Sequence, residues 1–190
     1  MHASTYFEHL PELWSWSESL RTAAAAATPN AAHRACAQAG VGVITCNVDG
    51  LHARAGSDAV ELHGTVFKGR CRRGHRFDVV DGVVTSATPV PACVSCGAAR
   101  ARPDVLLFGE VAARANRDRA WWLLSGARVL VVVGSSGVVW PSAGYPGEVA
   151  ARGGRTVLVN AEPWPDFDFD ETHLGDAAEL LPGVLAGLSG

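Results

Sequence analysis

The sequence has little charge and no long apolar run, and both shortages narrow what the protein can be. Charged residues make up 18% of its 190 residues, and the net charge is −3. Nucleic-acid-binding domains usually carry a basic stripe, so we expect no nucleic-acid partner. No stretch approaches the roughly 20 apolar residues that span a bilayer. The first residues also lack the basic and apolar regions of a signal peptide. We therefore expect a cytoplasmic protein that does not bind a membrane.

The cysteines are few and odd in number. There are five, and two of them form Cys93-Val-Ser-Cys96. In a chain without a secretion signal, such a pair indicates a metal site or a redox pair rather than a disulfide framework. Hydrophobic residues make up 48% of the chain, which is typical of a globular protein. A chain of this length can bury one core and a small additional module.

Residues 65–103 differ in composition from their surroundings. They are richer in Arg, Gly, Pro and Cys, with a weak hairpin-like pattern over residues 77–85. Before them, residues 6–39 are predicted to be helical with a break at Thr28-Pro29, and residues 41–45 form a short β-branched strand. We interpret residues 65–103 as a small module inserted in a larger domain of residues 1–64 and 104–190.

Strands and helices alternate along the rest of the chain. We predict strands at residues 105–108, 128–133 and 156–160, and helices at 112–124, 143–152 and 177–188. This order predicts an α/β fold, a Rossmann-like parallel sheet with helices on both faces. Ligands of such sheets bind outside the carboxyl ends of the strands. The residues there are small or polar: Cys46 to Asp49, Gly134 to Gly137 and Asn160 to Glu162.

Taken in order, these motifs resemble the sirtuins, the NAD-dependent protein deacylases. The resemblance runs over residues 29–183 and rests on many short segments rather than one. They are Pro29-Asn30 with His33, Thr45-Cys-Asn-Val-Asp-Gly-Leu-His52, Glu61-Leu-His-Gly64, the cysteine module, Arg102-Pro-Asp-Val-Leu-Leu-Phe-Gly-Glu110, Val133-Gly-Ser-Ser136, Pro141-Ser-Ala-Gly144, Asn160-Ala-Glu162 and Leu181-Pro182.

The resemblance implies a lysine deacylase (deacetylase) that uses NAD and releases nicotinamide and O-acyl-ADP-ribose. Its partner would be an acylated-lysine protein or peptide. His63 matches the family's catalytic base, and a histidine can accept a proton near neutral pH. Asn47 and Asp49 match residues that line the nicotinamide pocket. The alternative interpretations are a core or capping histidine for His63 and a strand-end Asx turn for Asp49.

The same resemblance assigns the remaining cofactor and substrate contacts. Peptide recognition would add the substrate as a strand through main-chain hydrogen bonds, with the residues Phe108, Gly109, Glu110, Gly137 and Val138. The residues that match NAD contacts are Cys46, Asn47, Asp49, Gly134, Ser135, Ser136, Asn160, Glu162 and Ala177.

The cysteine module matches the structural zinc site of the family, with one change. Sirtuins hold zinc with two cysteine pairs, and here the first pair reads Cys71-Arg-Arg-Gly-His75. His75 would replace the missing thiolate, which gives a Cys3His zinc-ribbon site of Cys71, His75, Cys93 and Cys96. A site that has lost its metal and a simple redox pair are the alternatives.

Three features depart from the family pattern. The Gly-Ala-Gly phosphate loop and the strand leading into it are not in this sequence, so the sheet would be incomplete beside Val129–Val133. That apolar edge would need a cover, provided by the N-terminal residues, by self-association as a homo-oligomer, or by a partner chain.

Cys46 stands where the family usually has Gln. Ser17 and Leu20 stand where members that remove acidic acyl groups have Tyr and Arg, which argues against an acidic-acyl preference.

Two other functions fit the same residues. One is an enzyme that cleaves NAD and passes ADP-ribose to a protein or to water, an ADP-ribosyltransferase or NADase. The other is a non-catalytic NAD- or peptide-binding module that acts with a partner. The missing phosphate loop favours the second of these, whereas the joint presence of Asn47, Asp49 and His63 favours an enzyme.

Overall fold

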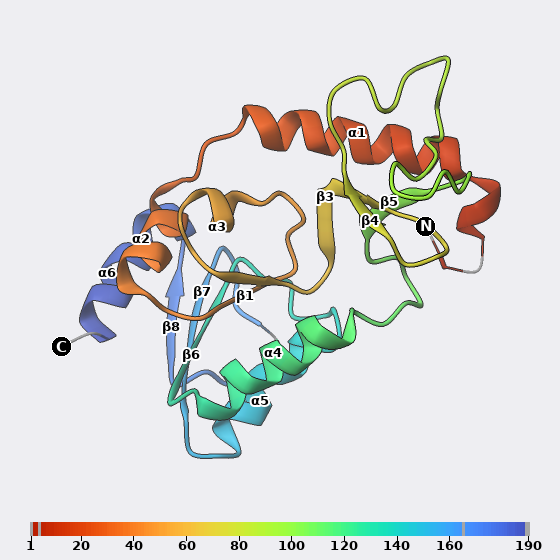
Figure 1. The fold of residues 1–190 in the computed structure, drawn as a ribbon. Helices are drawn as coiled ribbons and strands as arrows, with labels where there is room; N and C mark the ends of the chain where they lie inside the picture. Colours follow the sequence, from red (N-terminus) through yellow and green to blue (C-terminus); the bar gives the residue numbers. More distant parts are fainter. Residues whose placement is uncertain (1, 4, 165, 189–190) are drawn as a thin grey trace. The chain divides into compact units, whose positions relative to one another are not determined.

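The computed structural model describes residues 2–3, 5–164 and 166–188 (Figure 1). It divides into two compact units. The first consists of Met1–Thr28, Ile44–Arg54 and Ala59–Arg117, and the second of Pro29–Val43, Ala55–Asp58 and Asp118–Gly190. No helix of the described residues is long and apolar enough to cross a membrane.

The first unit is built on a three-stranded antiparallel sheet, β4-β3-β5. Its elements are the 3-10 helix Tyr6–Glu8, α1 (Leu10–Ala26), α3 (Leu51–Arg54), β2 (Ala59–Glu61), β3 (Gly64–Arg70), β4 (Arg76–Asp78) and β5 (Arg102–Val105), with most of β1 (Val43–Thr45). The strands β1 and β2 form a separate two-stranded sheet.

Helix α1 covers the antiparallel sheet with one apolar face. The buried residues recur every three or four positions, which places them on one side of the helix: Leu10, Leu13, Trp14, Ser17, Arg21 and Ala24. The helix starts with a proline in its first turn and ends just before Thr28-Pro29, as predicted. Burying a side chain of the size of Leu13 contributes about 1.5–3 kcal/mol.

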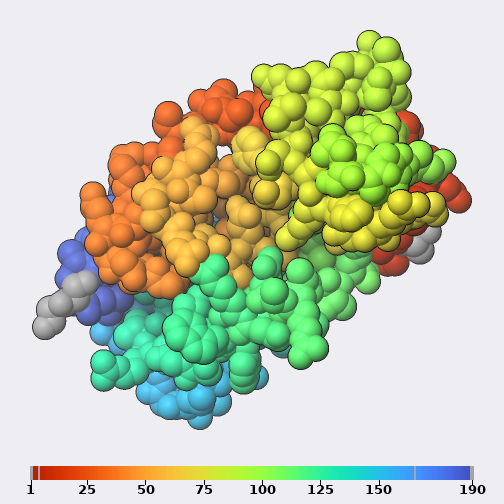
Figure 2. Space-filling view, in the orientation of Figure 1, coloured from red at the N-terminus to blue at the C-terminus, as the bar shows by residue number. Residues whose placement is uncertain are grey.

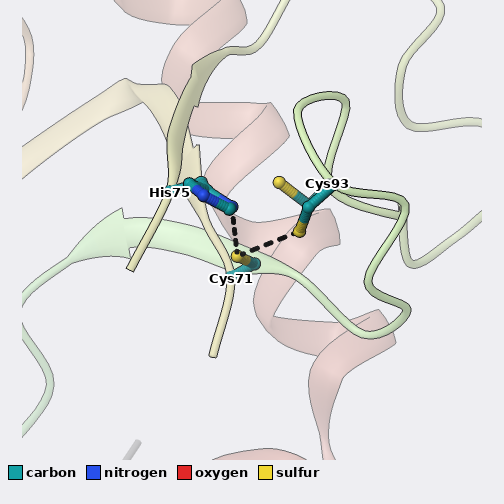
Figure 3. Close-up of side chains that lie close together, drawn as sticks. Cys71, His75 and Cys93 are labelled. Atoms are coloured by element: carbon teal, nitrogen blue, oxygen red, sulfur yellow. Dashed lines mark hydrogen bonds between the residues drawn. The ribbon is translucent and has the colours of Figure 1, made fainter. Parts of the chain in front are cut away.

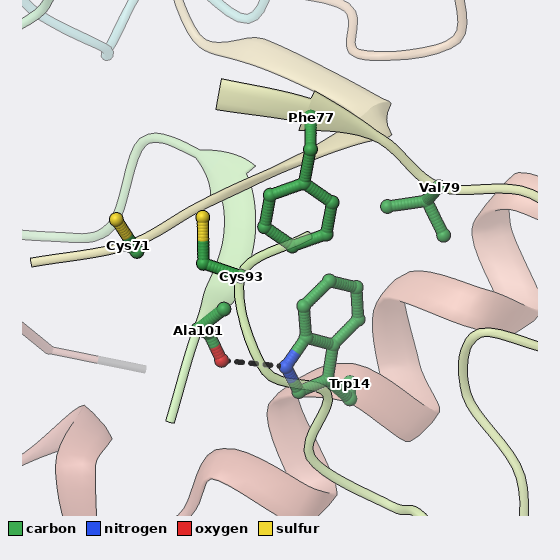
Figure 4. Packing of buried hydrophobic residues seen from close by; sticks show 6 residues of the cluster. All are labelled: Trp14, Cys71, Phe77, Val79, Cys93 and Ala101. Atoms are coloured by element: carbon green, nitrogen blue, oxygen red, sulfur yellow. Dashed lines mark hydrogen bonds between the residues drawn. The ribbon is translucent and has the colours of Figure 1, made fainter. Parts of the chain in front are cut away.

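Trp14 joins the helix to the cysteine module. Its indole lies against Phe77 and Val79, and its Nε1–H donates to the carbonyl oxygen of Ala101 at 2.9 Å (Figure 4). Cys71 and Cys93 belong to the same buried cluster. The helix and the cysteine-bearing loops therefore share one core. In the space-filling view, β3, β4 and the segment up to β5 lie together on the surface, coloured yellow to green (Figure 2).

The second unit contains a three-stranded parallel sheet, β6-β7-β8, with matched register. Its elements are α2 (Ala31–Ala39), most of α4 (Arg114–Gly126), β6 (Val129–Val133), the 3-10 helix Ser142–Gly144, α5 (Tyr145–Ala150), β7 (Arg155–Asn160), β8 (Glu171–Leu174) and α6 (Ala177–Leu188). Helix α5 contacts β6 and β7, α6 contacts β7, and α2 lies against α6. The central strand β7 is buried from Thr156 to Val159.

Strand β6 lies at one end of this sheet. Among the described residues it pairs with β7 alone, and Val129 and Val133 are 38% and 36% exposed. The predicted parallel sheet is confirmed, and so is the exposed apolar strand at Val129–Val133. Strands of a parallel sheet are ordinarily covered on both faces. Strand β6 is apolar, partly exposed and unpaired along one edge among the described residues, and such an edge can pair with another chain.

Two predictions of local structure were wrong, and one strand of the parallel sheet was not predicted. The strand expected at residues 105–108 lies at Arg102–Val105 and pairs antiparallel with β3. Pairing with β3 buries Pro103 and Asp104, which local sequence patterns do not favour in a strand. The hairpin expected over residues 77–85 is absent, since β4 ends at Asp78 and no strand follows before β5. The polar strand β8 was not predicted, because Glu171–Leu174 carries almost no apolar signal.

Candidate functional site

A polar loop follows β1 in the first unit. The hydroxyl of Thr45 accepts from the backbone N–H of Asn47 at 3.0 Å, and Oδ1 of Asp49 accepts from the N–H of Leu51 at 3.0 Å. Asp49 thus caps the short helix α3, as the Asx-turn interpretation predicts. Asn47 is exposed and Asp49 half-buried. The two residues lie in the loop rather than on an extended strand, because β1 ends at Thr45.

His63 is held by its backbone on both sides. The N–H of Leu62 donates to the carbonyl of Thr45 at 2.9 Å, and the carbonyl of His63 accepts from the N–H of Leu106 at 2.8 Å. Gly64 follows with φ +76°, and a Cβ there would overlap the carbonyl oxygen of Asp104. A glycine is therefore required directly after the histidine.

The imidazole of His63 is hydrogen-bonded to Cys46. This bond raises the pKa of His63; burial opposes the shift, and the charge of the Cys46 thiolate adds to it. Residue 46 comes directly after the end of β1, and residue 63 comes two residues after the end of β2. The structure therefore joins two of the predicted site residues in one hydrogen-bonded pair, and it places Asn47 next to them along the chain.

The predicted NAD contacts of the second unit meet in one hollow of about 760 Å³. Its lining residues come from the carboxyl ends of β6, β7 and β8 and from the start of α6. They are Gly134, Ser135, Ser136, Val159, Asn160, Ala161, Glu162, Gly175, Asp176 and Ala177. All six residues assigned to this side from the sequence line it. The volume lies within the range of small-molecule sites.

Three hydrogen bonds fix the loop after β6. The amide of Asn160 donates to the carbonyl of Ser135 at 3.1 Å, and the indole N–H of Trp164 donates to the same oxygen at 2.7 Å. The N–H of Gly134 donates to the carbonyl of Val159 at 3.0 Å. Gly137, with φ +75°, packs directly against the Trp164 ring. The loop backbone is thus held in place before any ligand arrives.

The residues predicted to bind a substrate peptide lie in both units. Phe108, Gly109 and Glu110 belong to the first, and Gly137 and Val138 to the second. Phe108 and Val138 are 74% and 75% exposed. Phe108 also pairs with the chain's own residues: it forms a parallel bridge with His2, and its carbonyl accepts from the N–H of Ala3 at 2.8 Å.

The side chain of Glu110 is engaged inside the first unit. Its carboxylate accepts from Arg102 at 2.7 and 2.8 Å, from Arg70 at 2.9 Å and from the N–H of Leu107 at 3.0 Å. Burial opposes ionisation, but the Arg102 hydrogen bonds lower the pKa of Glu110. The side chain of Glu110 is therefore not available to a peptide, and its backbone N–H already donates to the carbonyl of Leu107 at 3.0 Å. The sequence had offered no sign of this buried ion pair.

The four predicted metal ligands converge in the first unit. Ligand atoms of Cys71, His75, Cys93 and Cys96 all lie within 4.8 Å of one another. The sulfur of Cys71 is 3.7 Å from Nδ1 of His75 and 3.9 Å from the sulfur of Cys96. Figure 3 shows Cys71 facing His75 and Cys93. Ligands of a tetrahedral zinc lie about 3.5–4 Å apart, given bond lengths of about 2.0–2.3 Å. The donor set fits a Cys3His zinc.

Tight turns present these ligands. The N–H of Cys71 donates to the carbonyl of His75 at 3.0 Å, and the N–H of Cys93 donates to the carbonyl of Ala98 at 2.8 Å. Burial opposes ionisation of Cys93, but backbone hydrogen bonds from Ser95 and Cys96 lower its pKa to about 6. A cysteine that already favours its thiolate form is suited to bind a metal.

Two residues that line or support the hollow were not predicted. Trp164 anchors the loop after β6, and Asp176 caps α6 by accepting from the N–H of Ala178 at 2.7 Å. An Asp directly before an apolar helix is a recognisable N-cap signal. No local signal marks Trp164, since its partner is 29 residues away.

Comparison with known proteins identifies the family of the chain. The model of the Sir2 family matches residues 1–141. A protein of Ralstonia nicotianae named NAD-dependent protein deacylase is 38% identical over 189 residues, covering 96% of this chain and 76% of the relative.

Solved structures give the same result. One described as a Sir2 homolog–NAD complex matches with a TM-score of 0.89 and 32% identity, over 99% of this chain and 75% of that chain. Another, Sir2 bound to acetylated peptide, matches with a TM-score of 0.86 and 30% identity, over 99% of this chain and 82% of that chain. The chain belongs to the Sir2 family.

Proposed function

We propose that the protein removes acyl groups from lysine side chains, consumes NAD as co-substrate, and releases nicotinamide and O-acyl-ADP-ribose. The observation that carries this proposal is the hollow in the second unit, which is lined by the six residues assigned to NAD from the sequence. Relatives named NAD-dependent protein deacylase and a Sir2 structure with an acetylated peptide support the acyl-lysine substrate.

The residues of the second unit would hold the adenosine side of NAD. Gly134 has φ +57° and no atom within 4 Å of where a Cβ would lie, so a dinucleotide can approach the backbone. The hydroxyls of Ser135 and Ser136 can bond to ribose or phosphate, and the carboxylate of Glu162 can accept from the ribose diol. Asn160 holds the loop through Ser135, and Ala177 offers its backbone to adenine.

The residues of the first unit would carry the chemistry. Asn47 and Asp49 contact the nicotinamide carboxamide, and Cys46 lies beside the ribose. The bond from C1′ to nicotinamide breaks, and the acyl oxygen of the substrate lysine takes its place at C1′. His63, in its neutral form, then accepts the proton of a ribose hydroxyl, so that this oxygen can attack the acyl carbon. The lysine nitrogen then takes a proton and leaves the acyl carbon, and a water molecule adds to that carbon. The bond from the acyl carbon to the C1′ oxygen breaks, which gives O-acyl-ADP-ribose and the free lysine.

The remaining assignments complete the proposal. A substrate peptide pairs with the main chain at Phe108–Glu110, where it takes the place of His2 and Ala3 beside Phe108, and at Gly137–Val138, as in other strand-addition complexes. Zinc, held by the Cys71 cluster, has a structural role in an inserted module of residues 65–103, because it ties the β3–β4 turn to the Cys93–Cys96 turn. We place the enzyme in the cytoplasm, where its five cysteines form no disulfide bonds and stay reduced. We assign the cover of strand β6 to a second copy or a partner chain.

Nicotinamide release tests the function. The purified chain is incubated with NAD, with and without an acetyl-lysine peptide. We expect release that depends on the peptide and falls at least about a hundredfold in His63→Ala, as for loss of a general base. His9→Ala is the matched control, because His9 is exposed and its side chain caps no helix.

The other outcomes separate the remaining functions. Release without peptide would assign an NADase or ADP-ribosyltransferase activity to the same residues. No release, together with no NAD binding by calorimetry, would leave a non-catalytic module. Release that is unchanged in His63→Ala would contradict the role of this histidine.

A further inference from the structure

The segment proposed to bind the substrate peptide is a tight turn of residues 107–110. The backbone N–H of Glu110 donates to the carbonyl of Leu107 at 3.0 Å, and Gly109 between them has φ +85°. A glycine with positive φ at the third position is typical of a type II turn. Phe108 occupies the second position, where its side chain is 74% exposed. The turn therefore presents the Phe108 ring to solvent.

An extended segment already lies beside this turn. His2 forms a parallel bridge with Phe108, and the N–H of Ala3 donates to the carbonyl of Phe108 at 2.8 Å. The carbonyl of Phe108 is thus placed where an extended backbone can donate to it. Because this conformation exists without any substrate, the groups that hold it determine how readily a peptide can bind.

The carboxylate of Glu110 closes the turn a second time. It accepts from the N–H of Leu107 at 3.0 Å, and it accepts from two nitrogens of Arg102 at 2.7 and 2.8 Å. Such a bidentate, charge-assisted pair fixes direction as well as distance. Nη2 of Arg102 also donates to the carbonyl of Val105 at 2.5 Å. One side chain thus joins the end of β5 to the far end of the turn.

Arg102 is itself held in place. Its side chain is 5% exposed, and its guanidinium lies over the ring of Tyr6, 4.6 Å from the centroid. Arg70 of β3 donates to the same Glu110 carboxylate at 2.9 Å. A buried ion pair adds little net stability, because removing two charges from water offsets their attraction. Its main consequence here is geometric, since it gives the turn one position relative to β5.

We propose that Arg102 is a positioning residue for the substrate peptide. Through Glu110 it sets the turn of residues 107–110 before a peptide arrives, and it acts without contact with the peptide. This role rests on the proposed function, in which the peptide pairs with the main chain of the turn. A preformed turn loses less conformational entropy on binding, so peptide affinity depends on the Arg102–Glu110 pair. The chemical step does not depend on it.

Glu110→Gln tests this role in the full chain, because glutamine keeps the shape but loses the charge and one acceptor. Arg102→Lys keeps the charge but cannot make the bidentate pair. Fluorescence anisotropy measures the binding of a labelled acetyl-lysine peptide, and nicotinamide release measures turnover. In both variants we expect the Kd and KM for peptide to rise about fivefold, with kcat at saturating peptide and the Kd for NAD unchanged. Glu18→Gln is the matched control: Glu18 pairs with the buried Arg21 on α1, and the change should leave peptide binding unaltered.

Hydrogen exchange measured by NMR tests the turn in the unsubstituted chain, where no variant has to fold. The amides of Leu107 and Glu110 should be protected without peptide, and the peptide should raise their protection by less than about twofold. In Glu110→Gln the Leu107 amide should exchange about tenfold faster, because it loses its charged acceptor.

Three results would overturn the proposal, and they differ in what they leave standing. The first is that both amides exchange freely in the free chain and become protected only with peptide. The second is a folded Glu110→Gln chain that binds peptide as tightly as the unsubstituted chain, in which case the deacylase function still stands. The third is an unsubstituted chain that binds no acetyl-lysine peptide although both amides are protected. The proposed function then fails, and the role of Arg102 fails with it.

Discussion

Gly64 lies so close to Asp104 that a Cβ on the glycine would overlap the carbonyl oxygen of Asp104. This contact sits at the start of β3, where Gly64 pairs with Val105 in the antiparallel sheet. It sets the position of His63, the residue before it, relative to β5. His63 is thus placed by the backbone of the sheet rather than by a side-chain contact alone.

Gly64→Ala should therefore lower the free energy of unfolding by more than about 3 kcal/mol. About 1–2 kcal/mol comes from forcing a non-glycine residue to positive φ, and the rest comes from the backbone overlap. Gly153→Ala is the matched control: its φ of +77° is the same within a degree, but a Cβ there meets nothing within 4 Å. It should cost about 1–2 kcal/mol. Equal losses for the two variants, measured by urea denaturation, would show that the overlap has no effect.

Cys46→Ala should lower the pKa of His63. The hydrogen bond to Cys46 raises this pKa, so without the bond the opposing effect of burial remains. Because the neutral imidazole is the base, the acid limb of the activity profile should move to lower pH together with the pKa. NMR titration of His63 measures the shift directly. Cys36→Ala is the control that should leave the pKa unchanged, and a pKa of His63 that stays the same or rises in Cys46→Ala would rule out this account.

His75→Ala should reduce zinc from about one ion per chain to a small fraction, because three ligands remain of a four-ligand structural site. His75→Cys should keep the zinc, since it restores a fourth ligand of suitable chemistry. Arg73→Ala, an exposed change in the same turn, should have no effect. Elemental analysis gives the zinc content. If His75→Ala retains a full equivalent, His75 is not a ligand.

Trp164→Phe should weaken NAD binding several-fold by calorimetry. The change keeps a ring beneath Gly137 but removes the N–H that donates to the carbonyl of Ser135 at 2.7 Å. The loop after β6 then has one restraint fewer, so it loses more conformational entropy when NAD binds. Trp122→Phe, at a residue that is 71% exposed, is the control. Equal affinities for both variants would show that the indole N–H does not hold the loop for NAD.

The sequence predicts the second unit better than the first. Helix α6 was predicted at the residues where it is found, 177–188, although its Asp176 cap was not predicted. Strand β6 was predicted within one residue, since a run of Val and Leu marks a buried parallel strand. The rule that ligands bind at the carboxyl ends of parallel strands pointed to Gly134–Ser136 and Asn160–Glu162 of the hollow, whereas Ala177 was assigned from the resemblance alone.

The first unit depends on long-range pairing, which local patterns do not report. Strand β5 contains Pro103 and Asp104, both poor strand formers, and it forms because β3 pairs with it and Arg76 and Arg70 neutralise Asp104. The Cys46–His63 contact joins segments 17 residues apart and needs the meeting of β1 and β2. The resemblance to sirtuins predicted the four metal ligands as a set, and their ligand atoms do lie together. The spacing of Cys93 and Cys96 alone is a signal of a metal or redox pair.

The fate of the acyl group tests the central claim most directly. The protein is incubated with NAD and an acetyl-lysine peptide, and all products are quantified by mass spectrometry. We predict equal amounts of nicotinamide, deacetylated peptide and O-acetyl-ADP-ribose, with none of the three formed above background in His63→Ala. Free acetate in place of the acetylated nucleotide at the earliest times, or ADP-ribose formed while the peptide stays acetylated, would contradict the account.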